Sequence, residues 1–165
     1  MKRSELKRKT PLKRTAIKRK QTKKKSPRTK KKSLRSLKKK AWELLSKAIR
    51  LERRQGPARL VECVSCQRQM PWKQIQAGHF IDGRFNSILF DERGIHPQCS
   101  MCNVVYNGRK EEYFIYMERT WGREIIDDLR AQRNRQVNFT TEDLEAMIKQ
   151  YQQRIADELN FRGPE

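Results

Sequence analysis

The sequence contains no hydrophobic run close to the ~20 residues that a helix needs to cross a membrane, so we expect no membrane-spanning segment. The basic N-terminus is followed by no apolar stretch of the kind found in secretion signals, and we therefore expect a protein that is not secreted. Hydrophobic residues make up 35% of the 165 residues and charged residues 36%. A large hydrophobic core that includes the whole chain is excluded by this composition.

Acidic residues are nearly absent from the N-terminal region. Residues 1–40 contain 21 Lys or Arg and one acid, Glu5, whereas residues 41–165 contain 19 basic and 18 acidic residues. Like charges at this density repel each other, so residues 1–35 are predicted to be a disordered arm. A solvated tail and a membrane-surface tail are alternatives, but the arm has no apolar face for a membrane. We expect it to bind nucleic-acid phosphates, with candidate residues Lys23, Lys24, Lys25, Lys30, Lys31 and Lys32.

Cysteine and histidine are scarce and confined to one stretch. The four cysteines form two C-x-x-C pairs, Cys63/Cys66 and Cys99/Cys102, and both histidines lie between the outermost cysteines. Two such pairs are typical of a structural Zn²⁺ site, because each tight turn presents two thiolates to one metal. Two disulfides in a secreted protein are one alternative, and a Cys₂His₂ site that uses His79 or His96 is another. The 32 residues between the pairs exceed the needs of a minimal zinc ribbon.

The hydrophobic periodicity predicts an α+β protein with flanking helices. A helix is expected over 36–55, in a segment 36–56 whose apolar side packs on a zinc-binding core at 57–110. Within the core we expect a strand over 74–81, a turn at 82–84, a second strand over 87–91 and a helix that begins near Cys102. The C-terminal region 111–165 is predicted to be helical, with a break at Gly122. Thr140 and Asp143 resemble a helix-capping pair before a last helix that ends near residue 159.

The residues between the cysteine pairs favour phosphodiester chemistry. His79 sits in the first predicted strand, where a neutral imidazole can accept a proton from water. Asn103 follows the last cysteine, where it can bind a metal or phosphate, and a helix cap is the plainer alternative for an Asn at this place. A His on a strand, a second strand and an Asn on a helix form the arrangement of HNH, or ββα-metal, nucleases. In such a site a divalent ion stabilises the leaving oxygen, and zinc supports a fold with a small core.

From Cys63 to about residue 159 the chain resembles the NinG/Rap family of lambda-like phages, the recombination endonucleases of the nin region. The similarity lies in C-V-S-C, A-G-H-F, F-D-E-R-G-I-H-P-Q-C-S-M-C-N, the following N-G, and Y-Q-Q-R near residue 151. The resemblance implies a DNA endonuclease that cuts branched intermediates such as Holliday junctions and D-loops. It also implies a small zinc-stapled HNH core, catalytic Mg²⁺ or Mn²⁺, and action in the cytoplasm of the bacterial host.

The sequence departs from the usual HNH pattern at two positions. Gly78 stands where an Asp metal ligand usually precedes the histidine, and Gly94 stands where an Asn usually ties the loop. The second role is vacant or passes to Asn86 or Asp91. We expect His79 to be the general base.

The remaining site predictions concern the metal and the phosphate. His96 and Asn103 are expected to bind one or the other, Asp91 is a candidate metal ligand, and Arg84 and Arg93 are expected to contact phosphate. His96 as buried structure and Asp91–Arg93 as a surface ion pair are the plainer alternatives.

A second class of function is a non-catalytic zinc-ribbon protein that binds DNA or RNA, which Gly94 supports. A homodimer is a further hypothesis for the nuclease, because resolving a four-way junction requires two nicks. The late helices would offer the interface.

Overall fold

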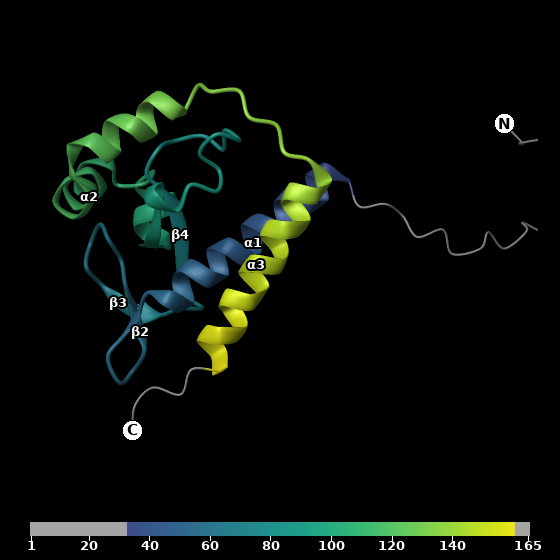
Figure 1. The fold of residues 1–165 in the computed structure, drawn as a ribbon. Helices are drawn as coiled ribbons and strands as arrows, with labels where there is room; N and C mark the ends of the chain where they lie inside the picture. Colours follow the sequence, from purple (N-terminus) through teal and green to yellow (C-terminus); the bar gives the residue numbers. More distant parts are fainter. Residues whose placement is uncertain (1–32, 161–165) are drawn as a thin grey trace, which may run out of the picture. The chain divides into compact units, whose positions relative to one another are not determined.

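A computed structural model describes residues 33–160, which form a mixed α+β structure with two small sheets (Figure 1). The six lysines assigned to the basic arm lie outside the described residues. The elements in chain order are α1 (Leu34–Glu52), β1 (Arg54–Gln55), β2 (Leu60–Glu62), β3 (Gln69–Pro71), β4 (Ile75–His79), the 3₁₀ turn η1 (Glu92–Gly94), β5 (Ile95–Cys99), the π-helical turn η2 (Met101–Val105), α2 (Lys110–Gln132) and α3 (Thr141–Asn160).

Both sheets are antiparallel. Strands β1, β2 and β3 form one sheet in that order, and β4 pairs with β5 in the other. In the β4–β5 pair Ile75 lies opposite Cys99, and His79 lies opposite Ile95. The pair therefore connects the second cysteine pair at one end to the candidate catalytic histidine at the other.

The predicted strand over 74–81 is confirmed as β4, although His79 is its last residue and not its middle. The predicted strand over 87–91 is wrong, because this segment forms turns in which the amide of Ile88 bonds the carbonyl of Phe85. Its apolar residues Ile88 and Leu89 are buried within those turns. The true partner strand is β5, whose sequence contains Pro97 and so reads poorly as a strand.

Helices α1 and α3 lie side by side (Figure 1). Ser33 caps α1, and its Oγ accepts a hydrogen bond from the Ser36 amide at 3.2 Å. The helix begins two residues before the predicted start and ends three before the predicted end. Its apolar side packs mainly on α3 and also contacts β4 and β5, which belong to the predicted zinc-binding core. The shared core also takes in one residue each from β4 and β5, and its buried members are Leu37, Ala41, Leu45, Ile49, Ala77, Ile95, Leu144, Ile148 and Tyr151.

The C-terminal helices follow the sequence signals closely. Gly122 interrupts α2 with φ 80° and ψ 167°, which confirms the predicted break. The capping pair before α3 is also confirmed, because the Asp143 amide bonds Thr140 Oγ1 at 3.1 Å and the Thr140 amide bonds Asp143 Oδ2 at 2.9 Å. The buried side of α3 ends at Ile155, and Leu159 is exposed. In Figure 1, β4 lies between α2 and the α1–α3 pair.

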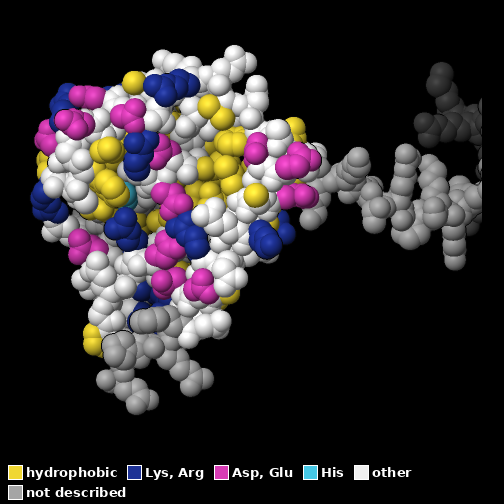
Figure 2. All heavy atoms as spheres, viewed as in Figure 1, with side chains coloured by type: hydrophobic (Ala, Val, Ile, Leu, Met, Phe, Trp, Pro, Cys, Tyr) yellow, Lys and Arg dark blue, Asp and Glu magenta, His cyan; other side chains and the backbone are white. Residues whose placement is uncertain are grey.

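The surface of the folded body carries mixed charge. On the face drawn in Figure 2, Lys and Arg side chains alternate with Asp and Glu around an apolar area. This pattern agrees with the near balance of 19 basic and 18 acidic residues over 41–165. Within the described residues no helix is long and apolar enough to cross a membrane.

Candidate metal centre and active site

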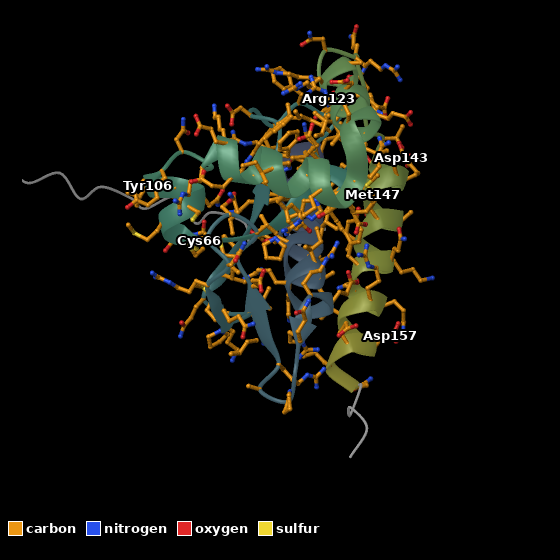
Figure 3. All side chains as sticks on the ribbon, turned by 90° about the vertical axis from the view of Figure 1, so that its left-hand side faces the viewer. Cys66, Tyr106, Arg123, Asp143, Met147 and Asp157 are labelled. Carbon is orange, nitrogen blue, oxygen red and sulfur yellow. The ribbon has the colours of Figure 1, made fainter. Side chains whose placement is uncertain are left out.

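The four cysteines converge on one point. The Sγ atoms of Cys63, Cys66, Cys99 and Cys102 all lie within 4.8 Å of one another, and none is in a disulfide. Four thiolates at 2.3 Å around a tetrahedral Zn²⁺ stand about 3.8 Å apart, and the Cys66–Cys99 separation is 3.8 Å. The cluster is thus consistent with the predicted zinc site. Figure 3 shows Cys66 far from Met147 and Asp157 on α3.

The backbone around the cluster is organised for a metal. In the first turn the Gln67 amide bonds the Cys63 carbonyl at 2.8 Å, and Gln67 adopts a φ of 59°. The Cys99 amide donates to Cys63 Sγ at 3.3 Å, and the Cys102 amide donates to Cys99 Sγ at 3.4 Å. Burial raises the pKa of Cys63, and burial together with the neighbouring thiols raises the pKa of Cys102. Four ionised sulfurs therefore need a bound cation here, which fits the chemistry of Zn²⁺.

A polar cavity of about 180 Å³ lies at the end of β4. It brings together His79 from the strand, Arg84 from the following loop and Asn103 from η2, three of the residues predicted to form the site. The other lining residues are Ala77, Ile81, Asp82, Gly83, Asn107 and Gly108. Single π-helical turns such as η2 are frequent at functional sites. A larger cavity of about 540 Å³ shares Ile81 and Asp82 but contains neither His79 nor Asn103, so we assign no chemistry to it.

His79 has the protonation state of a general base. Its Nε2 lies 3.2 Å from the carbonyl oxygen of Leu89. Because a carbonyl only accepts, Nε2 carries the hydrogen and Nδ1 keeps a free lone pair. Burial of the ring, and then the charge of Arg84, lower the pKa of His79, so the ring is neutral at pH 7. The ring also stacks on Trp42, with centroids 4.5 Å apart.

The backbone beside His79 is held closely on two sides. Tyr113 is a buried residue of α2, and its hydroxyl donates to the Gly78 carbonyl at 3.0 Å. On the other side, a Cβ at position 78 would lie 2.1 Å from Gln98 Oε1 and 3.0 Å from Asn103 Oδ1. An aspartate at this position would therefore displace Gln98. Gly78 is required by the packing, and Asn103 lies within η2, so it does not cap that turn.

Three predicted site residues lie outside the cavity. His96 is 0% exposed, its Nε2 contacts the Arg93 carbonyl at 3.0 Å, and its ring lies among the aromatic residues Tyr113, Tyr116 and Trp121. Burial, and then the charge of Arg53, lower its pKa to about 4, so His96 is a neutral core residue. Asp91 and Arg93 form an ion pair at 2.6 Å, and Arg93 also bonds Asp128 of α2 at 2.8 Å. This geometry matches the plainer alternatives: buried structure for His96 and an ion pair for Asp91 and Arg93.

Neither proposed substitute for the missing loop asparagine contacts His79. Asn86 Nδ2 donates to the Val137 carbonyl at 2.7 Å, and Asp91 caps η1. The loop is tied instead by main-chain groups: the Leu89 carbonyl at His79, and the Gly94 carbonyl, which accepts from the Phe80 amide at 2.8 Å. A side chain at position 94 would point at Leu129 of α2.

Sequence reasoning missed a basic cavity next to the site. It has a volume of about 230 Å³ and shares Arg84 with the polar cavity. It has no acidic residue in its lining, which consists of Arg35, Lys38, Lys39, Trp42, Arg84, Asn86 and Leu89. The Arg84 guanidinium lies 5.7 Å from the centroid of the Trp42 ring. The available signal in the sequence was a Trp within a lysine-rich helix.

Comparisons with known proteins agree with this arrangement of motifs. The sequence model of a family described as "Bacteriophage Lambda NinG protein" matches residues 1–160. Protein ninG of Escherichia phage 933W is 32% identical over 102 residues, which cover 61% of this chain and 50% of the relative. Protein ninG of Escherichia phage lambda is 31% identical over 102 residues, covering 61% and 49%. Protein ninG of Salmonella phage P22 is 31% identical over 96 residues, covering 58% and 46%.

The chain spans about half the length of the curated relatives it matches. No solved structure matches it significantly.

Proposed function

The chain belongs to the NinG family of lambda phage proteins, and from this premise we propose that it is a metal-dependent DNA endonuclease of the HNH type. The main observation in support of this proposal is a neutral histidine, His79, in a polar cavity, with its Nε2 hydrogen directed to the Leu89 carbonyl. The order β4, β5, η2 supports the interpretation of this core as a ββα-metal fold in which the π-helical turn η2 takes the place of the helix. We propose that the substrate is branched DNA, such as a Holliday junction or a D-loop, in the host cytoplasm during phage growth.

The chemistry assigned to the residues is hydrolysis of a phosphodiester bond. His79 Nδ1 accepts a proton from water as the water oxygen attacks phosphorus and the 3′ oxygen leaves. Arg84 stabilises the charge on the non-bridging oxygens. Asn103 would hold Mg²⁺ or Mn²⁺, which when bound would stabilise the leaving oxygen.

The basic cavity supports a nucleic-acid substrate. Arg35, Lys38 and Lys39 lie on the first two turns of α1, and Arg84 belongs to this cavity and to the one that contains His79. A phosphate backbone held in the basic cavity would thus continue into the polar one. Such contacts are independent of sequence, so preference for a branch would come from the shape of the DNA. The basic arm would add affinity that falls with salt.

The deciding experiment is a nicking assay on a synthetic four-way junction and a matched linear duplex, with Mg²⁺ or Mn²⁺. Wild type should cut the junction, His79→Ala should not, and His96→Phe should cut because His96 lies outside the cavity. Junction binding without cutting by wild type would overturn the proposal.

The result of binding without cutting would favour the second candidate, a non-catalytic zinc-ribbon protein. Its support in the structure is that neither Gly78 nor Gly94 supplies the side chain usual in an HNH site. Because two nicks resolve a junction, we also propose a homodimer on DNA. Sedimentation that shows only a monomer on junction DNA would contradict the dimer and leave the nuclease proposal intact.

A further inference from the structure

The larger cavity, of about 540 Å³, adjoins the polar cavity that contains His79. Ile81 and Asp82, which come shortly after β4, line both cavities. The volume falls within the range of about 300–1,000 Å³ that is usual for pockets that take small molecules. A group bound in the larger cavity would therefore lie next to whatever occupies the polar one.

The wall of the larger cavity is apolar and aromatic. Phe80 and Phe114 are partly buried and pack on the buried core of α2, with ring centroids 6.4 Å apart. Ile115, in contrast, lines the cavity with 60% of its surface exposed. The guanidinium groups of Arg123 and Arg130 lie 5.5 and 5.6 Å from the centroid of the Phe114 ring. Aromatic rings and guanidinium planes are the surfaces on which proteins stack nucleobases.

The charged residues of this cavity are mainly basic. They are Lys110, Arg130, Arg133, Asp82 and Glu111. The acidic charge of Asp82 is compensated, because its carboxylate pairs with Lys110. Arg130 is held loosely by Asp127, at 3.6 Å, and Arg133 has no ion pair within residues 33–160. The apolar wall is thus bordered by cations that are available to a phosphate group.

An exposed aromatic ring lies between the two cavities. The guanidinium carbon of Arg133 lies 5.1 Å from the centroid of the Phe85 ring, and Phe85 is 42% exposed. The same ring covers Gly83 in the lining of the polar cavity, where a Cβ would lie 2.5 Å from it. Phe85 and Arg133 therefore extend the stacking surface from the larger cavity toward the polar cavity.

We propose that the larger cavity receives one unpaired nucleobase of the DNA, next to the phosphate in the polar cavity. The inference rests on the proposed nuclease function and specifies the feature of branched DNA that the protein recognises. An apolar, aromatic wall with a basic border complements a base joined to its phosphate. A paired base must first leave the stack, at an energetic cost, whereas a base in the displaced strand of a D-loop or at an open branch point is already free.

The first test compares two DNA ligands of the zinc-loaded full chain, without Mg²⁺ or Mn²⁺. One is a duplex with a single unpaired thymidine, and the other has an abasic nucleoside at the same position. The unpaired base should tighten binding by about tenfold, which is the typical effect of stacking one base. Equal affinity of wild type for the two DNAs would overturn the inference.

Two variants locate the effect. Ile115→Glu places a carboxylate in the cavity at an exposed position and should abolish the difference between base and abasic site. The matched control is Leu159→Glu on α3, which adds the same charge at a side chain that is 53% exposed and should keep the difference. A difference that survives in Ile115→Glu, or that is lost in both variants, would contradict the assignment to this cavity.

A second measurement needs no variant. Photo-cross-linking of wild type to DNA with 5-iodouracil at the unpaired position should attach the base to Phe80 or Phe114. Attachment to Trp42 would place the base in the basic cavity instead, and would overturn the inference, as would attachment to Tyr106 at the exposed end of η2.

The outcomes separate this inference from the nuclease proposal. Junction cutting by a protein that does not prefer an unpaired base would overturn this inference alone. A base preference that Ile115→Glu abolishes, in a protein that cuts no DNA, would overturn the nuclease and keep the base-binding cavity. Loss of self-association in Ile115→Glu, with the base preference intact, would assign the cavity to a second copy of the chain.

Discussion

The ring of Trp42 stacks on the ring of His79, with centroids 4.5 Å apart and planes inclined by 23°. The contact joins α1 to the end of β4, so the helix that follows the basic arm directly supports the candidate catalytic base. Arg84 approaches the same Trp ring, with its guanidinium carbon 5.7 Å from the ring centroid. Trp42 therefore connects the basic cavity to the polar cavity.

Replacing Trp42 with Ala should slow junction nicking by about fivefold or more. Aromatic pairs of this kind contribute about 1 kcal/mol beyond their buried area, which corresponds to roughly a factor of five. Trp42→Phe retains a stacking ring and should lose less activity. Equal rates for the two variants at saturating DNA would show that stacking does not position His79.

The nicking rate should rise with pH, with an inflection below the ordinary histidine pKa of about 6.5. The reason is that burial and Arg84 lower the pKa of His79, and only the neutral ring accepts a proton. A single-turnover pH profile measures the inflection. Arg84→Ala removes a positive charge and should move the inflection to higher pH, whatever its effect on the rate. An inflection well above 6.5 in wild type would contradict a buried neutral base.

Purified protein should contain one Zn²⁺ per chain, and a strong zinc chelator should lower its unfolding temperature. The four clustered thiols come from both ends of the module, and zinc binding of this kind contributes directly to folding. Metal analysis and thermal unfolding with and without chelator provide the measurement. Protein without metal that unfolds on addition of a thiol reductant would point instead to disulfides.

Arg84→Ala and Arg93→Ala should have opposite signatures. Arg84 lines both the polar cavity and the basic cavity. Its loss should therefore weaken junction binding or slow nicking, with little effect on the free energy of unfolding. Arg93 is paired with Asp91 and Asp128, and solvent screens these partly exposed ion pairs. Its loss should therefore lower the free energy of unfolding by about 0.5–1 kcal/mol and leave nicking of the folded protein unchanged. Filter binding, nicking and urea unfolding on both variants separate the two roles. A large loss of nicking in the folded Arg93→Ala variant would show that Arg93 belongs to the active site.

His96 should make the protein less stable as the pH falls from about 6.5 to about 4. Its pKa is about 4 in the folded state, whereas an unfolded histidine titrates near 6.5, so in this window the unfolded chain binds the extra proton. Full titration through the window amounts to about 3 kcal/mol. The difference in unfolding free energy between wild type and His96→Phe should change by this amount. A constant difference across the window would mean that His96 keeps an ordinary pKa.

The parts predicted well from sequence are those governed by local chemistry. The spacing of the cysteine pairs was enough to predict their convergence, because each C-x-x-C turn is a local structure. Gly122 and the Thr140–Asp143 pair likewise act within a few residues, through backbone φ and capping hydrogen bonds. His79 and Asn103 line the same cavity because β4 pairs with β5, and η2, which contains Cys102, follows β5 directly.

The parts that sequence reasoning missed depend on long-range contacts. Asp91, Arg93 and His96 have suitable chemistry, but their placement depends on contacts with α2, which no local pattern encodes. The strand at 95–99 was missed because Pro97 argues against a strand, whereas the apolar run at 87–91 argues for one. Gln98 belongs to no sequence motif. Its packing against Gly78 depends on the pairing of two strands and could not be predicted from local sequence.

The main-chain oxygen that orients His79 has a consequence for genetics. Because the acceptor is the Leu89 carbonyl, any side chain at position 89 that preserves the turn keeps the hydrogen bond. Substitutions at position 89 would therefore report only the loss of a buried hydrophobic side chain. They would not reveal that the main-chain carbonyl of this residue orients His79. Chemical replacement of the main-chain amide, not mutation, is therefore the way to detect the group that selects which nitrogen of the histidine is free.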